Sequence, residues 1–195
     1  MHGFADMPPF AAWRHRAARD GFEVVFFAAH GGGMRIEGQT TAIERGEPFA
    51  VGYVIELDQA WRTLAAQISE RSRNGSHTVA LQSNGDASWL VDGRPEPQLD
   101  GCCDVDLEAS AMTNALPIRR IGLEVGDSAE APALYVRSPG LAVERLEQRY
   151  LREETSQEHR YAYSAPAFDF HCELVYDASG LLLDYPGIAV RVSGA

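Results

Sequence analysis

The first half of the chain alternates between apolar and polar side chains, which is the pattern of β-strands that have one buried face. Residues 49–57 place an apolar side chain at nearly every second position, and residues 34–41 alternate in the same way. Residues 22–29 form an apolar run rich in β-branched and aromatic side chains, as in a buried strand. Asn-Gly and Asp-Gly pairs, which favour hairpin turns, punctuate the later segments. The pattern predicts an antiparallel sheet over residues 22–99.

The glycines at 31–33 allow two interpretations. A glycine-rich loop can hold a phosphate group, but such a loop normally opens a helix. Here the alternating segment 34–41 follows instead. The glycines therefore predict a hairpin turn between two strands.

Residues 58–71 and 141–154 show helical spacing although each lies among predicted strands. In the first segment Trp61, Leu64 and Ile68 follow the i, i+3, i+7 template of an amphipathic helix. The second segment shows the same spacing after a Ser-Pro-Gly turn. Periodicity alone leaves helix and strand open for both segments.

One short helix is predicted at about residues 115–123. Ser110, Thr113 and Asn114 are candidate caps for its first turn, and Pro117 is tolerated in a first turn but not deeper in a helix. Ala115 and Gly122 lie on one stripe of the predicted helix. Such small residues allow the helix to lie close against a sheet.

Aromatic side chains are spread along the predicted strands. Most of them are expected in the core, and some are expected to line a cavity, because a curved sheet with one covering helix need not fill its concave face. These aromatic residues are Tyr53, Trp61, Trp89, Tyr150, Tyr161, Phe168, Phe170 and Tyr185.

Length and charge limit the possible classes of protein. The chain has 195 residues, 45% hydrophobic side chains and a formal net charge of -11, which fits a single globular domain over residues 1–195. An acidic chain is a poor partner for nucleic acid or for an anionic membrane surface. No apolar run reaches the roughly 18 residues of a transmembrane segment. The sequence identifies no protein partner.

Cysteine usage and the N-terminal residues predict a cytoplasmic location. The three cysteines cannot all pair, and adjacent Cys102 and Cys103 are poor partners for one another, so reduced thiols are expected. The first residues lack the charged and then apolar pattern of a signal peptide.

Asp104 and Asp106 are the most distinctive candidates for chemistry. On one strand face two residues apart, their Cα atoms would lie about 7 Å apart, close enough for each carboxylate to perturb the pKa of the other. They fit either an acid–base pair or a cation site, or else a structural role, in which they cap loops or pair with Arg119 and Arg120. The structural role is favoured because no nucleophile or histidine lies nearby in sequence.

Other common catalytic motifs are absent from the sequence. It contains no Gly-x-Ser-x-Gly elbow, no phosphate-binding loop ending in Lys-Ser or Lys-Thr, and no Cys-x-x-Cys pair. The six histidines show no metal-ligand spacing. We therefore predict no metal and no cofactor.

Several motifs resemble those of a known family. They comprise Leu99-Asp100-Gly101-Cys102, Asp104-Val105-Asp106-Leu107, Asn114-Ala115-Leu116-Pro117-Ile118-Arg119-Arg120, Gln148-x-Tyr150, Tyr161-x-Tyr163 and Asp184-Tyr185-Pro186. In this order they resemble the bacterial "putative glycolipid-binding" family over about residues 13–191. Cys103 departs from the family pattern, in which an apolar residue is more usual at this position.

The resemblance implies a mainly β fold of the β-rich α+β type, in which a long curved antiparallel sheet or half-barrel wraps around one short central helix, as in bacterial lipoprotein carriers. It also implies that residues 58–71 and 141–154 are strands. It provides no set of catalytic residues. The residues that match the family motifs are candidates either for a ligand-binding cluster or for the network that holds the helix: Asp104, Asp106, Asn114, Arg119, Arg120, Gln148, Tyr150, Asp184 and Tyr185.

Two functions remain open at this stage. The first is non-enzymatic binding or carriage of an amphipathic ligand, such as a glycolipid or acyl conjugate, in an apolar cavity with a polar rim where Arg119 or Arg120 holds the head group. The second is an enzyme of lipid or glycolipid metabolism that uses Asp104 or Asp106 as acid or base, which requires a carboxylate with a raised pKa facing a pocket. An interaction module that uses a sheet edge is a third, less specific alternative.

Overall fold

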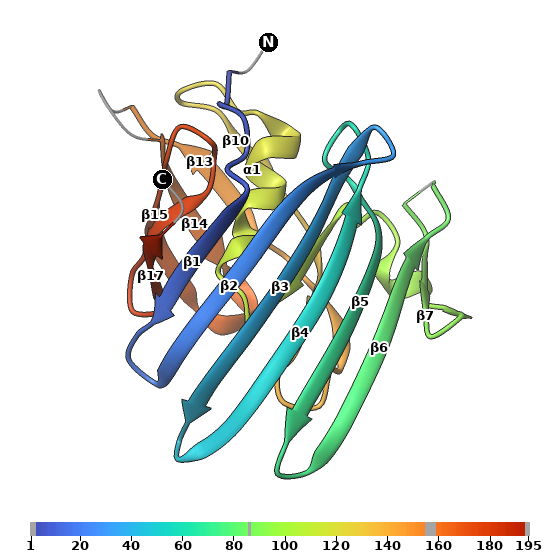
Figure 1. The fold of residues 1–195 in the computed structure, drawn as a ribbon. Coiled ribbons are helices and arrows are strands. Elements are labelled where there is room, and N and C mark those ends of the chain that lie inside the picture. The colour runs from blue at the N-terminus through green and yellow to red at the C-terminus, as the bar shows by residue number, and fades with distance from the viewer. Residues whose placement is uncertain (1–2, 86, 155–158, 194–195) are drawn as a thin grey trace.

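A strongly curved antiparallel sheet surrounds the single α-helix, α1 (Ala115–Ile121), in the computed structural model (Figure 1), which describes residues 3–85, 87–154 and 159–193. The sheet contains 14 strands in the order β10-β13-β14-β15-β16-β17-β1-β2-β3-β4-β5-β6-β7-β8 and does not close on itself. The predicted fold class, a long curved sheet wrapped around one short helix, is confirmed.

The two halves of the large sheet meet where β17 pairs with β1. The strands of the first half are β1 (Phe10–His15), β2 (Arg19–His30), β3 (Gly33–Glu44), β4 (Glu47–Leu57), β5 (Thr63–Ser72), β6 (Gly75–Ser83), β7 (Trp89–Val91) and β8 (Arg94–Pro95). The strands of the second half are β10 (Ser128–Glu130), β13 (Arg149–Arg152), β14 (His159–Ala165), β15 (Phe170–Tyr176), β16 (Leu182–Tyr185) and β17 (Ala189–Ser193).

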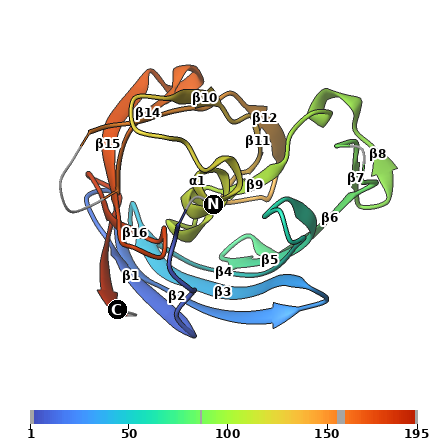
Figure 2. The same cartoon turned by 90° about the horizontal axis from the view of Figure 1, so that it is seen from above.

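A smaller sheet lies on the side where the large sheet remains open (Figure 2). It contains β9 (Asp104–Leu107), β11 (Ala133–Val136) and β12 (Val143–Leu146). The pairing of β9 with β11 is parallel, whereas β11 and β12 are antiparallel. Three short 3-10 helices complete the described elements: η1 (Pro97–Leu99), η2 (Met112–Asn114) and η3 (Pro166–Phe168).

The hairpin predicted from the glycine-rich segment is present. Strands β2 and β3 pair along their whole lengths, from Arg19 opposite Glu44 to His30 opposite Gly33. Gly31 and Gly32 form the turn with φ values of 59° and 85°, which glycine adopts without the steric cost that a side chain would bring.

Both segments with helical spacing are strands, as the family resemblance implied. Strand β5 is hydrogen-bonded to β4 on one side and β6 on the other, and this pairing overrides a weak local periodicity. Before β5 the chain turns at Asp58, whose side chain accepts hydrogen bonds from the backbone N–H groups of Ala60 and Arg62 at 2.8 and 2.9 Å. Residues 141–154 likewise form β12 and β13.

The predicted helix is present and ends where Gly122 adopts a left-handed conformation, with φ of 61°. Asn114 stands at the N-cap position, but its side chain does not cap the helix. Instead Asn114 Oδ1 accepts a hydrogen bond from Tyr150 at 3.1 Å. The prediction that the Asn114 side chain caps the helix is therefore wrong, because Asn114 Oδ1 is bound by Tyr150 on the sheet and not by a backbone N–H group of the helix.

A buried carboxylate on the sheet fixes the segment that leads into α1. Glu23, on the inner face of β2, accepts hydrogen bonds from the backbone N–H groups of Ala111 and Met112 at 2.8 and 3.3 Å. The hydroxyl groups of Ser110 and Tyr53 also donate to Glu23, the latter at 2.6 Å. Burial raises the pKa of Glu23, and these four donors oppose that effect.

The core occupies the concave side of the sheet around α1. Most of the predicted core aromatics are buried, among them Trp89, Tyr150 and Tyr161, whereas Phe168 is 42% exposed. No helix in the described part of the chain has the length and apolar character that crossing a membrane requires.

Candidate functional site

A cleft of about 450 Å³ enters the molecule at the end of the sheet where β1 finishes, which is the lower end in Figure 1. Its inner part is lined by buried polar and aromatic side chains: Asp106, Ser110, Asn114, Tyr135, Tyr163 and Tyr185. Its mouth is lined by more exposed side chains: Arg16, Arg19, Glu44, Arg137, Phe168 and Ile188. The volume is within the range of about 300–1,000 Å³ that is usual for small-molecule sites.

Asp106 is the carboxylate in the inner part of the cleft. Thr113 Oγ1 donates a hydrogen bond to Asp106 Oδ1 at 3.1 Å, and Gln148 Nε2 donates to Asp106 Oδ2. Both donors are neutral. Burial raises the pKa of Asp106 to about 6, the two hydrogen bonds oppose this, and the charges of Asp104 and Glu108 add to it. Near neutral pH the site thus contains a carboxylate that can both accept hydrogen bonds and take up a proton.

Aromatic rings form one wall of the cleft. Tyr163 and Tyr185 meet edge to face with their centroids 6.2 Å apart, and Phe170 lies 6.1–6.2 Å from each of them. At the mouth Phe168 packs on Tyr135 at 5.4 Å. The rings of β14, β15 and β16 gather here because alternate residues of paired strands project from the same face of a sheet.

Each arginine at the mouth is paired with a carboxylate. Arg16 contacts Asp184 at 2.9 Å, and Arg137 contacts Glu144 at 2.6 Å. Arg19 Nε and Nη2 both donate to one oxygen of Glu44, at 3.0 and 2.8 Å. These ion pairs leave the mouth with little net charge.

His15 lies beside the ion pair of Arg19 and Glu44 and is 5% exposed. Neither of its ring nitrogens has a hydrogen-bond partner in the described structure. Burial and the charge of Arg19 lower the pKa of His15 to about 4, against the opposing effect of Glu44. The imidazole is therefore uncharged at neutral pH.

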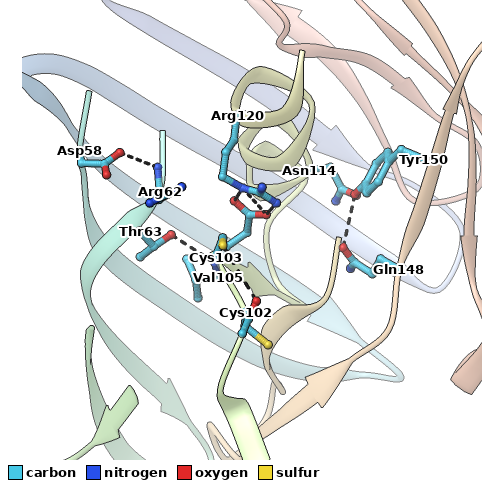
Figure 3. A network of polar contacts seen from close by, with 12 residues as sticks. Asp58, Arg62, Thr63, Cys102, Cys103, Val105, Asn114, Arg120, Gln148 and Tyr150 are labelled. Carbon is cyan, nitrogen blue, oxygen red and sulfur yellow. Dashed lines mark hydrogen bonds and ion pairs between the residues drawn. The ribbon is translucent and has the colours of Figure 1, made fainter. Parts of the chain in front are cut away.

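The cleft brings together only some of the candidates named from the sequence. Asp106, Asn114 and Tyr185 line it directly. Gln148 and Tyr150 stand behind them, because Gln148 binds Asp106 and Tyr150 donates to Asn114 Oδ1. Figure 3 shows Tyr150, Gln148 and Asn114 turned toward one another. These side chains hold the lining residues in place.

Asp104 and Arg120 form a separate buried ion pair. Arg120 Nη2 lies 2.6 Å from Asp104 Oδ2, and Arg120 Nε lies 3.0 and 3.1 Å from the two carboxylate oxygens. Figure 3 shows Arg120 extending from the helix toward the segment that contains Cys103 and Val105. Burial raises the pKa of Asp104 despite this guanidinium. Of the structural roles considered possible from the sequence, an ion pair with Arg120 is present for Asp104, whereas Asp106 is bound by Thr113 and Gln148.

Arg119 points toward the other end of the sheet. Its guanidinium stacks 4.1 Å from the Trp61 ring centroid and 5.4 Å from that of Phe4. It also donates to the backbone oxygens of Ala5 and Ser179. Neither Arg119 nor Arg120 is among the described residues that line the cleft, and Asp184 reaches its mouth only through Arg16.

His15 and Tyr135 are among the lining residues that had no signal in the sequence. His15 ends β1 and Tyr135 lies within β11, and pairings between distant parts of the chain bring them to the cleft. Among the described residues, no three His, Cys, Asp or Glu side chains come together in a way that could hold a metal ion.

Comparisons with known proteins agree on the fold. The model of a family described as "Putative glycolipid-binding" matches residues 10–191. The crystal structure of a DUF1089 family protein from Pseudomonas aeruginosa is 30% identical, with a TM-score of 0.75 over 92% of this chain and 95% of that chain. A beta-barrel-like protein of the domain of unknown function DUF1849 from Brucella abortus is 8% identical, with a TM-score of 0.54 over 96% and 95%, so it shows similarity of fold alone. A comparison with curated proteins returned no match.

Proposed function

Because the chain belongs to the family described as "Putative glycolipid-binding", we propose that its cleft binds an amphipathic ligand and encloses the polar head group of that ligand. The supporting observation is the position of Asp106, a buried carboxylate that lines the cleft and binds only neutral donors among the described residues. A buried charge with no cationic partner is costly for folding. A ligand whose hydroxyl groups donate to it would offset that cost.

The distribution of side chains in the cleft gives the ligand an orientation. The sequence had suggested an apolar cavity with a polar rim, but here the polar groups of Asp106 and Asn114 lie in the inner part. Apolar side chains at the mouth, Phe168 and Ile188, provide contacts for a hydrocarbon chain. The head group therefore enters first, and the chain leaves across these residues.

A sugar head group fits the inner part of the cleft. A pyranose ring has hydroxyl groups around its edge and apolar C–H groups on its faces. Asp106 offers hydrogen-bond acceptors for the hydroxyl groups, and the rings of Tyr163 and Phe170 offer apolar surface for the faces.

The proposal is tested by titrating the protein with octyl β-glucoside below its micelle-forming concentration and following the backbone amide signals by NMR. We expect saturable binding of one molecule, with the largest shifts at residues 106–114 and 163–170. Binding should be lost in Ala18→Trp, which places a large ring at the exposed mouth, and retained in Ala28→Trp, which lies on the exposed outer face of β2. Shifts that are absent, or spread over the outer face, would contradict the proposal.

Acid–base catalysis by Asp106 is a second candidate function, favoured by one observation. Asp106 faces the cleft with its pKa raised to about 6. A carboxyl group exchanges protons most effectively when its pKa lies near the pH of the reaction, and about 6 is close to neutral pH. Asp104, the other candidate from the sequence, is bound to Arg120. Release of glucose from bound octyl β-glucoside at pH 6, abolished in Asp106→Asn, would support catalysis. Stable binding without release would leave the protein as a binder only.

A further inference from the structure

Resting on the proposed function, we propose that the cleft selects ligands with an uncharged, hydroxyl-bearing head group and rejects head groups that carry a phosphate or carboxylate. A ligand would meet charged groups first at the mouth and then in the inner part of the cleft. It goes beyond glycolipid binding in general, because glycolipid head groups include both neutral and acidic kinds.

Each cation at the mouth lies beside a carboxylate. Arg19 is the most firmly held: it makes two hydrogen bonds to Glu44, a third to the backbone oxygen of Glu108 at 2.9 Å, and its side chain is only 12% exposed. Arg16 and Arg137 are each within 3 Å of a carboxylate. An anionic head group at the mouth would therefore meet each guanidinium together with its carboxylate, whose repulsion offsets much of the attraction of the cation.

No other positive charge is available from the described lining of the cleft. His15 is the remaining basic side chain there, and with its pKa lowered to about 4 it is neutral at pH 7. A neutral imidazole offers one N–H donor and one nitrogen acceptor, and both nitrogens of His15 are unpartnered. Such a group suits a hydroxyl rather than an anion.

The inner part of the cleft has negative charge and, among its described lining residues, no positive charge. The hydrogen-bond donors of Thr113 and Gln148 point at Asp106, and Tyr150 donates to Asn114 Oδ1, so these donors are already used. Asp106 and Glu108 both line the cleft. A sugar hydroxyl can donate to the Asp106 carboxylate, whereas a phosphate or carboxylate would bring like charge to a poorly solvated site.

A matched pair of probes tests the inference: octyl β-glucoside and octyl β-glucuronide, which differ in the carboxylate at C6. At pH 7.5 we expect the glucuronide to bind at least tenfold more weakly. The uncharged methyl ester of the glucuronide separates charge from shape, and it should bind within about threefold of the glucoside. Equal or tighter binding of the glucuronide would overturn the inference while leaving the proposed function intact. Failure of the glucoside itself to bind would overturn both.

The Asp106→Asn variant provides a second measurement that does not depend on a single affinity. It removes the negative charge from the cleft and retains the shape of the side chain. The ratio of the two affinities should fall at least threefold toward unity in this variant. An unchanged ratio, with the glucoside still bound, would show that Asp106 does not determine the selection and would contradict the inference.

Discussion

Gly38 on β3 and Tyr53 on β4 face one another, and the Tyr53 ring occupies the space that a side chain at Gly38 would need. A Cβ atom added at Gly38 would lie 2.1 Å from Tyr53 Cζ and 2.2 Å from its hydroxyl oxygen. The ring crosses β3 in this space to reach Glu23 on β2. A glycine in the middle of a long strand is therefore required by the hydrogen bond that helps to fix the entry to α1.

Gly38→Ala is expected to lower the free energy of unfolding by about 2–3 kcal/mol, because the displaced ring can no longer donate to buried Glu23. Urea denaturation followed by circular dichroism measures the loss. Gly52→Ala on the neighbouring strand is the matched control: its added Cβ would meet only Ser69 Oγ, at 3.3 Å. Similar losses in both variants would mean that glycine is needed for the strand and not for Tyr53.

Asp106→Asn should change how stability depends on pH. The folded protein raises the pKa of Asp106 from 3.8 to about 6, so between these values the folded state binds more protons than the unfolded state. The stabilisation is complete below pH 3.8 and is lost as pH rises through about 6. The loss is roughly 3 kcal/mol for a shift of about two pKa units.

The variant lacks this titration, so its stability relative to the original protein should increase by up to that amount from pH 4 to pH 7.5. Urea midpoints at several pH values measure the difference. A difference that stays constant with pH would show that Asp106 titrates alike in both states.

Removing one partner of the buried ion pair should cost more than removing both. Arg120→Met leaves Asp104, whose side chain is 2% exposed, without its cation, and is expected to cost about 3–5 kcal/mol. The combined Asp104→Asn and Arg120→Met variant should recover at least half of that loss. A double-mutant cycle in urea gives the coupling, and additive losses would argue against a mutually dependent pair.

Phe168→Ala should weaken ligand binding with little effect on stability. The ring is 42% exposed at the mouth and packs on Tyr135 from one side. We expect roughly five- to tenfold weaker binding of octyl β-glucoside, and a change in the free energy of unfolding below about 1 kcal/mol. Phe22→Ala, which removes a 51% exposed ring from the outer face of β2, is the control and should leave binding unchanged.

The sequence predicted those strands in which apolar and polar residues alternate in step with the buried and exposed faces of the sheet. Strand β4 alternates because one of its faces packs against the core and the other is only partly covered. The short helix was predictable from the residues around Pro117, a residue tolerated in a first turn. Periodicity was misleading around Trp61. That residue stands in a turn with φ of 64° beneath Arg119, and the strand that follows is specified by its two neighbours.

The candidate site was predictable only in part. The sequence placed Asp104 and Asp106 on one face of a strand, but their partners differ. Asp104 forms an ion pair with Arg120, whereas Asp106 accepts hydrogen bonds from neutral Thr113 and Gln148. No local pattern encodes that difference. His15 is similarly hidden, because its place in the cleft depends on pairing between β1 and β17.

The pairing of β1 with β17 also determines when the molecule can be completed during its synthesis. Strand β1 leaves the ribosome before the other strands of this sheet, yet one of its edges pairs with β17, the last of these strands to be made. Until then β1 presents unpaired backbone groups, as any free sheet edge does. The first strands can pair with one another during translation. The pairing of β1 with β17 cannot form until β17 has been made, and contacts between residues so far apart in the sequence form slowly. The nascent protein therefore has a prolonged stage in which a long sheet is exposed to other chains, and chaperone binding would be of most use at that stage.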